Sequence, residues 1–127
     1  MKNDKLVEIG KCKMMKQVTI DATNETLGRL ASKIAVLLRG KNLASYQPEV
    51  QPQVEVKVNN ADKVRFTGSK FASKTYYHYS GYHSGIRARK LSELWETRPT
   101  EVIRDCVYRM LPKNKTRDKI IRNLKFK

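Results

Sequence analysis

The sequence predicts a single domain of the α/β class, and three observations support that prediction. Residues 17–41 change from a two-residue to a 3.6-residue hydrophobic period, which is the pattern of a strand, a turn and an amphipathic helix. This is the first half of a βαβ unit. Val54, Val56 and Val58 alternate with polar residues, as in a second half-buried strand. The length of 127 residues suits one domain whose core needs neither disulfides nor a metal.

The first strand and helix are the clearest elements. Val18 and Ile20 alternate with polar neighbours, and residues 21–26 favour turns and helix caps. The apolar face of the following helix consists of Leu27, Leu30, Ala31, Ile34, Leu37 and Leu38. Its opposite face carries Arg29, Ser32, Lys33 and Arg39. Gly40 stands where a helix commonly ends on glycine, so the helix offers an apolar face to a sheet and a basic face outward.

The middle of the chain is less regular. Residues 42–53, with Tyr46 and two prolines, form a long connection without a period, and such loops are usually functional. Val64 and Phe66 predict a further short strand that ends at Gly68.

The C-terminal third predicts helices and a basic tail. Ala88, Leu91, Leu94 and Trp95 indicate a short helix, and Pro99 suits the first turn of another. The apolar face of that second helix consists of Val102, Ile103, Cys106, Val107 and Met110, and Pro112 ends it. Residues 112–127 are strongly basic, and Ile120, Ile121 and Leu124 could attach a short basic helix to the body. We expect this tail to be mobile until it binds a partner.

The charge is the strongest functional signal. Lys and Arg number 27 against 12 acidic residues, which gives a net charge of +15 and indicates a polyanionic partner. Residues 1–15 read as a basic N-terminal arm, without the apolar stretch of a secretory signal. Cys12 and Cys106 are not a disulfide framework and suit a reducing compartment, and no apolar run is long enough to span a membrane.

Motifs for catalysis, metals or cofactors are missing from the sequence. The turn before the first helix has one glycine, Gly28, and neither GxGxxG nor GxxxxGK[ST]. Gly28 could let a phosphate backbone approach the helix, or it could serve helix packing against the sheet. His78 and His83 have a spacing that zinc would accept, but no CxxC accompanies them. We therefore expect no enzymatic activity, no cofactor, no metal and no small-molecule substrate.

Residues 74–89 combine tyrosines, both histidines, glycines and basic residues in one segment. Aromatic rings stack on exposed bases, and Arg and Lys neutralise phosphates, so this mixture suits structured RNA. We expect an irregular segment in which Tyr76 or Tyr77 is partly buried, while Tyr82 and His83 face RNA. The alternative is that these side chains belong to the core.

Four stretches in order resemble the large-subunit ribosomal protein L13 family (uL13) of bacterial type. They are IDATNETLGRLASKIAVLLRGK, VNNADKVRFTGSK, KTYYHYSGYHSGI and MLPKNK, and the resemblance runs from about Val18 to Lys115. The resemblance implies a three-layer α/β/α domain over residues 16–127, with a small, mostly parallel four-stranded sheet. It also implies a structural constituent of the cytoplasmic ribosome that binds large-subunit rRNA early in assembly beside neighbouring ribosomal proteins.

The chain also departs from the family pattern. Residues 49–53 replace a loop that in the family contains aspartate and glycine, Ser84-Gly85 stands for a glycine pair, and Lys115 to Asp118 replaces a leucine-glycine-arginine sequence. The N-terminal arm is additional. These differences concern local RNA contacts and are compatible with an unusual bacterial lineage or an organelle.

We expect the RNA contacts on the basic helix face, the long loop, the Tyr/His/Arg segment and the tail. These residues are Arg29, Lys33, Arg39, Lys41, Tyr46, Lys74, Tyr77, His78, Tyr82, His83, Arg87, Arg89, Lys113, Asn114, Lys115 and Arg117. Two alternative functions stay open at this point: a small nucleotide-binding or RNA-modifying enzyme, and a free regulator that binds messenger RNA.

Overall fold

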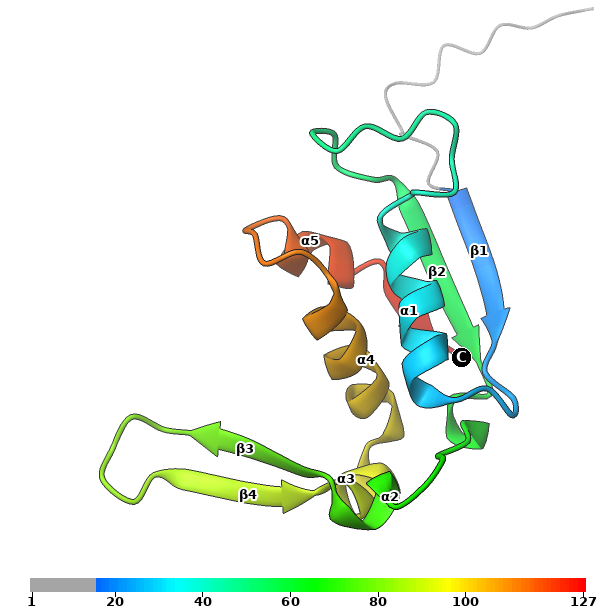
Figure 1. Cartoon of the computed structure of the whole chain (residues 1–127). Coiled ribbons are helices and arrows are strands. Elements are labelled where there is room, and N and C mark those ends of the chain that lie inside the picture. The colour runs from blue at the N-terminus through cyan, green and yellow to red at the C-terminus, as the bar shows by residue number, and fades with distance from the viewer. Residues whose placement is uncertain (1–15) are drawn as a thin grey trace, which may run out of the picture.

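A three-stranded parallel sheet forms the centre of the computed structural model, which describes residues 16–127 (Figure 1). Its strands are β1 (Lys16–Asp21), β2 (Val54–Asn59) and β5 (Leu124–Phe126), in the order β1-β2-β5. Val56 of the central strand pairs with Val18 on one side and Leu124 on the other. The basic arm expected at residues 1–15 lies outside the described residues.

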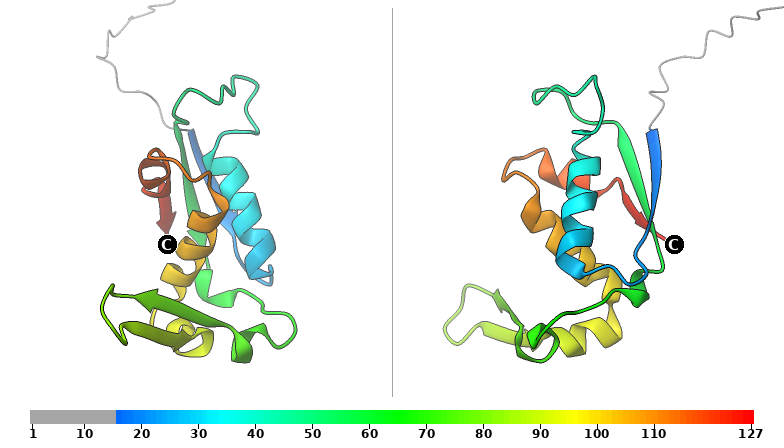
Figure 2. Two further views of the ribbon diagram at one scale, coloured as in Figure 1. Left: turned by 60° about the vertical axis from the view of Figure 1, so that its left-hand side comes forward. Right: turned by 45° about the vertical axis from the view of Figure 1, so that its right-hand side comes forward.

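Helices cover one face of this sheet. Helices α1 (Leu27–Leu38) and α4 (Pro99–Met110) pack against each other, and the turned views place both on the same side of the strands (Figure 2). The shorter elements are η1 (Ala61–Lys63), α2 (Lys70–Ser73), α3 (Leu91–Thr97) and α5 (Arg117–Ile121). The α/β class predicted from the sequence is confirmed.

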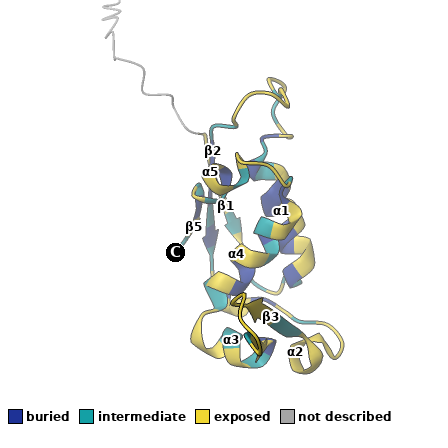
Figure 3. Ribbon diagram, turned by 90° about the vertical axis from the view of Figure 1, so that its left-hand side faces the viewer, coloured by how far each residue is buried: buried dark blue, intermediate teal, exposed yellow. Residues whose placement is uncertain are grey.

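Helix α1 has the orientation that its sequence predicts. Leu30 and Ile34 are fully buried, whereas Arg29 and Lys33 are exposed. Figure 3 shows buried and exposed stretches alternating along α1. Beyond the helix, Gly40 adopts φ +70° and its N–H donates to the Leu37 carbonyl, while the Lys41 N–H donates to the Val36 carbonyl. This is a Schellman motif, so the predicted glycine stop is confirmed.

The sheet has three strands in residues 16–127, so the expectation of four strands is wrong there. The strand predicted at Val64 and Phe66 shrinks to one isolated bridge between Thr26 and Arg65. Asn60 with φ 55° and the turn η1 redirect the chain after β2. Phe66 then packs edge-on against Trp95, with 4.7 Å between ring centroids, instead of alternating along a sheet.

The second face of the sheet is polar and carries no helix from residues 16–127. It presents Lys57, Asn59 and Glu55, and Lys125 Nζ lies 2.7 Å from Glu55 Oε1. The Lys125 ammonium holds the pKa of the Glu55 carboxyl below its usual range. The described part therefore has two layers, where the family resemblance implied three.

The C-terminal segment belongs to the body more than the sequence indicated. The short helix predicted around Ile120 is present as α5. Leu124, however, is buried in strand β5, which pairs with β2. The expectation of a mobile tail is therefore wrong for residues 124–126, because this short strand joins the central sheet.

A two-stranded antiparallel hairpin projects from the body. It consists of β3 (Thr75–Tyr79) and β4 (Ile86–Lys90), so the segment expected to be irregular has regular pairing (Figure 1). Ala88, expected in the following helix, lies in β4.

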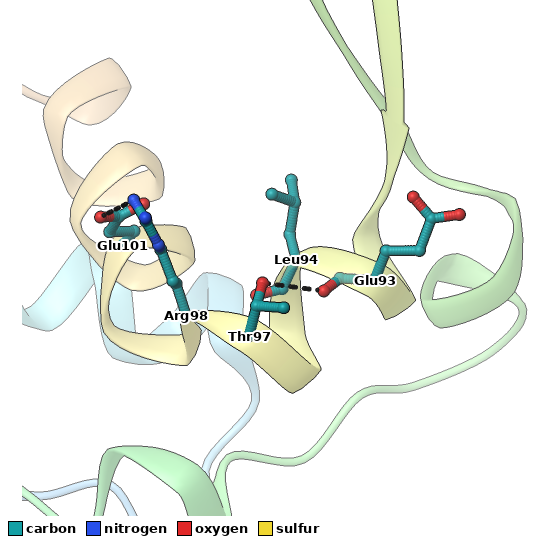
Figure 4. A network of polar contacts seen from close by, with 5 residues as sticks. All are labelled: Glu93, Leu94, Thr97, Arg98 and Glu101. Atoms are coloured by element: carbon teal, nitrogen blue, oxygen red, sulfur yellow. Dashed lines mark hydrogen bonds and ion pairs between the residues drawn. The ribbon is translucent and has the colours of Figure 1, made fainter.

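At the junction of α3 and α4, Thr97 Oγ1 donates to the Glu93 carbonyl at 3.0 Å and Arg98 pairs with Glu101 (Figure 4). These contacts lie at the bend between the helix that follows the hairpin and the helix that packs on α1.

Candidate nucleic-acid interface

The pairing of the hairpin divides its side chains between two faces. Tyr76 lies opposite Arg89 and His78 opposite Arg87, whereas Tyr77 lies opposite Ala88. Successive residues of a strand point to opposite faces. One face is therefore basic, and the other is uncharged along its middle.

The basic face lies against helix α4. Arg109 of α4 lies 5.8 Å from the centroid of the Tyr76 ring, and Lys74 Nζ lies 5.1 Å from the same centroid. Tyr76, Arg87 and Arg89 line a hollow of about 340 Å³ together with Asp105 and Arg109. Neither hairpin arginine forms an ion pair with a carboxylate in the described chain, so both remain available to phosphate groups.

The other face exposes aromatic and aliphatic surface. Tyr77 is 71% exposed, Tyr79 63% and Ile86 64%. Tyr76, by contrast, is half-buried, which confirms that one member of the Tyr76–Tyr77 pair is partly covered. The exposed tyrosines contribute nothing to the core, so the alternative reading as core residues fails for Tyr77.

The tip of the hairpin presents Tyr82 and His83 to solvent. Tyr82 is 80% exposed. Gly85 is required behind it, because a Cβ at this position would lie 2.1 Å from Ser80 Oγ and 2.8 Å from the Tyr82 carbonyl oxygen. The Ser80 N–H donates to the Gly85 carbonyl and closes the loop. Both side chains are exposed, as a contact with RNA requires, and their contact with RNA stays a prediction.

The two cations predicted on helix α1 differ in their surroundings. Lys33 Nζ donates to Glu25 Oε1 and is therefore already paired. Arg29 is exposed at the start of the helix and lines a cavity with Lys74 from the base of the hairpin. Arg29 is thus the better placed of the two for a phosphate.

A second group of predicted residues lies at the far end of α1 from the hairpin. Arg39 Nη2 donates to Tyr46 Oη at 3.0 Å, which ties the long loop to the helix end. Both residues line a hollow of about 190 Å³ together with Asn114. Lys41 is exposed beside this end.

The predicted residues of the C-terminal segment divide between exposed cations and structural contacts. Asn114 Oδ1 accepts from the Arg117 N–H at 3.1 Å and from Thr116 Oγ1 at 2.7 Å, so it caps the start of α5. The Arg117 guanidinium stacks 3.8 Å from the centroid of the Tyr108 ring. Lys113 and Lys115 are exposed, and neither forms an ion pair within residues 16–127.

The structure thus separates the predicted residues other than Lys33 into two clusters. The hairpin cluster contains Lys74, Tyr77, His78, Tyr82, His83, Arg87, Arg89 and, through the cavity, Arg29. The loop cluster contains Arg39, Lys41, Tyr46 and the segment 113–117 near the opposite end of the body (Figure 1).

Sequence reasoning missed three cations of the hairpin cluster. Arg65 and Lys70 line the same cavity as Arg29, and Arg109 faces Tyr76. Arg65 lies in a stretch interpreted as a strand, Lys70 follows the turn that ends this strand at Gly68, and Arg109 lies on a helix that was interpreted only for its apolar face. The sequence feature that could have indicated Arg65 and Lys70 is the presence of basic residues on both sides of Gly68.

The described residues contain no arrangement of a catalytic or metal site. No group of three or more His, Cys, Asp or Glu side chains lies close enough to hold a metal ion within residues 16–127. Burial raises the pKa of the Cys106 thiol, which disfavours the reactive thiolate. None of the helices in this part of the chain is long and apolar enough to cross a membrane.

Comparison with known proteins gives one consistent result. The model of a family described as ribosomal protein L13 matches residues 15–126. Large ribosomal subunit protein uL13 of Aquifex aeolicus is 49% identical over 106 residues, which cover 84% of this chain and 74% of that protein. The uL13 of Syntrophobacter fumaroxidans is 44% identical over 110 residues, or 87% and 78% of the two chains. Protein uL13c of Gracilaria tenuistipitata var. liui is 42% identical over 84% of this chain and 74% of that protein.

Proposed function

The chain belongs to the ribosomal protein L13 family, and on that premise we propose that its two basic clusters bind large-subunit rRNA early in assembly. Membership makes the protein a structural constituent of the large ribosomal subunit that supports translation, with rRNA and other ribosomal proteins as partners. Its location is the cytoplasmic ribosome, and the similarity to uL13c of Gracilaria is compatible with an organellar one. No feature of residues 16–127 favours the enzyme or the free messenger-RNA regulator.

The observation that supports the proposal best is the basic face of the hairpin. Arg87 and Arg89 lie on a two-stranded ribbon outside the core, and no carboxylate in the described chain pairs with them. Phosphate contacts of this kind position a protein on RNA and supply most of its affinity. Because the ribbon projects from the body, it can enter folded RNA while the sheet remains outside.

The aromatic residues of the hairpin have a complementary role in this proposal. Tyr77 and Tyr82 are highly exposed, and His83 lies beside Tyr82 at the tip. Stacking of a base on an aromatic side chain contributes about 1–3 kcal/mol. We assign these residues to contacts with unpaired nucleotides, and the loop cluster around Arg39 and Lys113 to phosphates of a second RNA segment.

Replacing Arg87 and Arg89 by Ala should weaken binding to a large-subunit rRNA fragment without changing the melting temperature. Each lost phosphate contact should lower the slope of log affinity against log salt by about 1, so the double variant should lose about 2. The matched control is Lys119→Ala with Arg122→Ala, which removes the same charge at exposed positions of the C-terminal segment, where neither residue forms an ion pair within residues 16–127. Filter binding over a salt series measures the slope, and in subunit reconstitution the hairpin variant should enter particles later.

Two results would count against this role of the hairpin. A lower melting temperature would mean that the arginines stabilise the fold. An unchanged slope in a stable variant, or an equal loss in the control, would mean that the hairpin arginines make no specific phosphate contacts.

A further inference from the structure

A cavity of about 590 Å³ lies between the first turn of α1, the segment that leads into α2 and the helices α3 and α4. We propose that this cavity binds one nucleotide of the RNA strand, with its phosphate held by Arg29, Arg65, Lys70 and Lys74. The inference rests on the proposed rRNA binding and specifies one binding pocket within it. Its volume is within the range of about 300–1,000 Å³ that is typical of small-ligand sites.

The charge of the cavity selects an anion. The four cations come from α1, the bridge residue Arg65, α2 and the base of the hairpin, so the fold brings together residues that are distant in sequence. No carboxylate lines the cavity, and none of the four cations forms an ion pair within residues 16–127. Like charges that converge without counter-charges are costly unless an anion joins them.

The wall of the cavity is partly apolar. Leu27 and Leu91 are buried, and Phe66 packs against Phe71 and Trp95 at centroid distances of 5.3 and 4.7 Å. All of Leu27, Phe66 and Leu91 line the cavity beside the cations. A nucleotide has the matching division, because its ribose and base can cover apolar surface while its phosphate meets the cations.

Gly28 separates two explanations for a glycine in the first turn of α1. A Cβ at this position would meet no atom within 4 Å, so packing against the sheet does not require glycine there. Gly28 lines the cavity and leaves its surface open. The backbone is thus accessible to a ligand beside Arg29, in agreement with the phosphate-approach alternative considered for the sequence.

Lys74 connects the cavity with the hairpin and thereby favours a strand of RNA over a free nucleotide. Its ammonium lies 5.1 Å from the Tyr76 ring centroid, and Tyr76 lines the hollow under the basic hairpin face. The same Lys74 lines the cavity. A backbone that passes along Arg87 and Arg89 can therefore continue to Lys74 and place its next nucleotides at Lys70 and Arg29.

The test compares two double variants. The cavity variant carries Lys70→Ala and Lys74→Ala together, and the control variant carries Lys119→Ala and Lys127→Ala. All four lysines are exposed, so the two variants remove equal charge at the surface. With a large-subunit rRNA fragment at 100 mM salt, we expect the cavity variant to bind at least about 10-fold more weakly and to lose about 2 from the salt slope. The control should change affinity less than the cavity variant does.

A second variant, Gly28→Leu, fills the cavity without removing charge. Nothing lies within 4 Å of the new Cβ and leucine favours helices, so the melting temperature should not fall. RNA affinity should fall because the side chain occupies the space of the nucleotide. Cys106 lines the cavity and reports occupancy: in a Cys12→Ser background, bound RNA should slow its alkylation in the wild type and less in Gly28→Leu.

The outcomes separate this inference from the proposed function. If the wild-type protein does not bind the rRNA fragment at all, the proposed function fails. If it binds but both cavity variants retain wild-type affinity and salt slope, the pocket is wrong while rRNA binding stands. If adenosine monophosphate alone protects Cys106 at micromolar concentration and RNA does not, the pocket serves a free nucleotide and the RNA inference is overturned.

Discussion

Affinity for a large-subunit rRNA fragment should fall by about 10³-fold or more between 50 and 200 mM salt. The expectation follows from the net charge of +15 and from neutralisation of roughly six phosphates, each of which releases condensed counterions. The structure supplies enough cations for six phosphate contacts, because four further cations are exposed in addition to Arg87 and Arg89 of the hairpin. These are Arg29, Lys41, Lys113 and Lys115. None of these forms an ion pair with a carboxylate of residues 16–127.

Filter binding at several salt concentrations measures this dependence, and the aromatic residues provide an internal control. Replacing Tyr77 and Tyr82 by Ala should lower affinity at every salt concentration but leave the slope unchanged, since stacking releases no counterions. A nearly flat salt dependence of the wild-type protein would refute the electrostatic account of binding. Affinity that is carried mainly by stacking would produce that result.

The part of the fold that could be predicted from the sequence is the part whose interactions are local. Helix α1 begins at Leu27 and ends before Gly40 as its period and its glycine indicate. Helix α4 begins at Pro99 for a similar reason, since proline at this position loses no intrahelical hydrogen bond. Capping and period act within a few residues, so one sequence suffices to recognise them.

Two errors of the sequence prediction concern contacts between distant residues, whereas the hairpin of β3 and β4, which was also missed, is local. Strand β5 has only three residues, and its place beside β2 depends on a pairing across more than half of the chain. Val64 and Phe66 have the alternation of a strand, but the Phe66 ring packs against Trp95 and the segment does not join the sheet. A two-residue alternation is too short to distinguish a strand from an extended segment that packs on a helix.

The residues of the candidate site, too, could be predicted from the sequence only in part. Residue type alone identified the hairpin segment, because Arg, Tyr and His interleave there. The arrangement of Arg65, Lys70 and Arg109 around these residues arises from tertiary structure, and in the sequence only the basic residues on either side of Gly68 indicate part of it. Conversely, Asn114 and Arg117 look like tail residues, yet one caps α5 and the other stacks on Tyr108.

Replacing Leu30 by Ala should destabilise the protein by about 2–5 kcal/mol, whereas Lys33→Ala should cost at most about 1 kcal/mol. Leu30 of α1 is fully buried in the hydrophobic core, so the truncation leaves a cavity there. The Lys33 side chain is 58% exposed, and its pairing with Glu25 is a surface ion pair. Urea denaturation with an unchanged m value measures the two differences on one scale.

Comparing these two variants tests an assumption on which both proposals depend. The assumption is that buried apolar residues stabilise the fold while exposed basic residues are free to bind RNA. A small domain of this kind has a stability of roughly 5–15 kcal/mol, so Leu30→Ala should remove a large share of it. At a urea concentration where both variants remain folded, Leu30→Ala should bind rRNA as the wild type does, because Leu30 contacts only the core. If Lys33→Ala destabilised as much as Leu30→Ala, the basic face of α1 would be part of the packing. The argument that the exposed cations of α1 bind RNA because the fold does not need them would then fail.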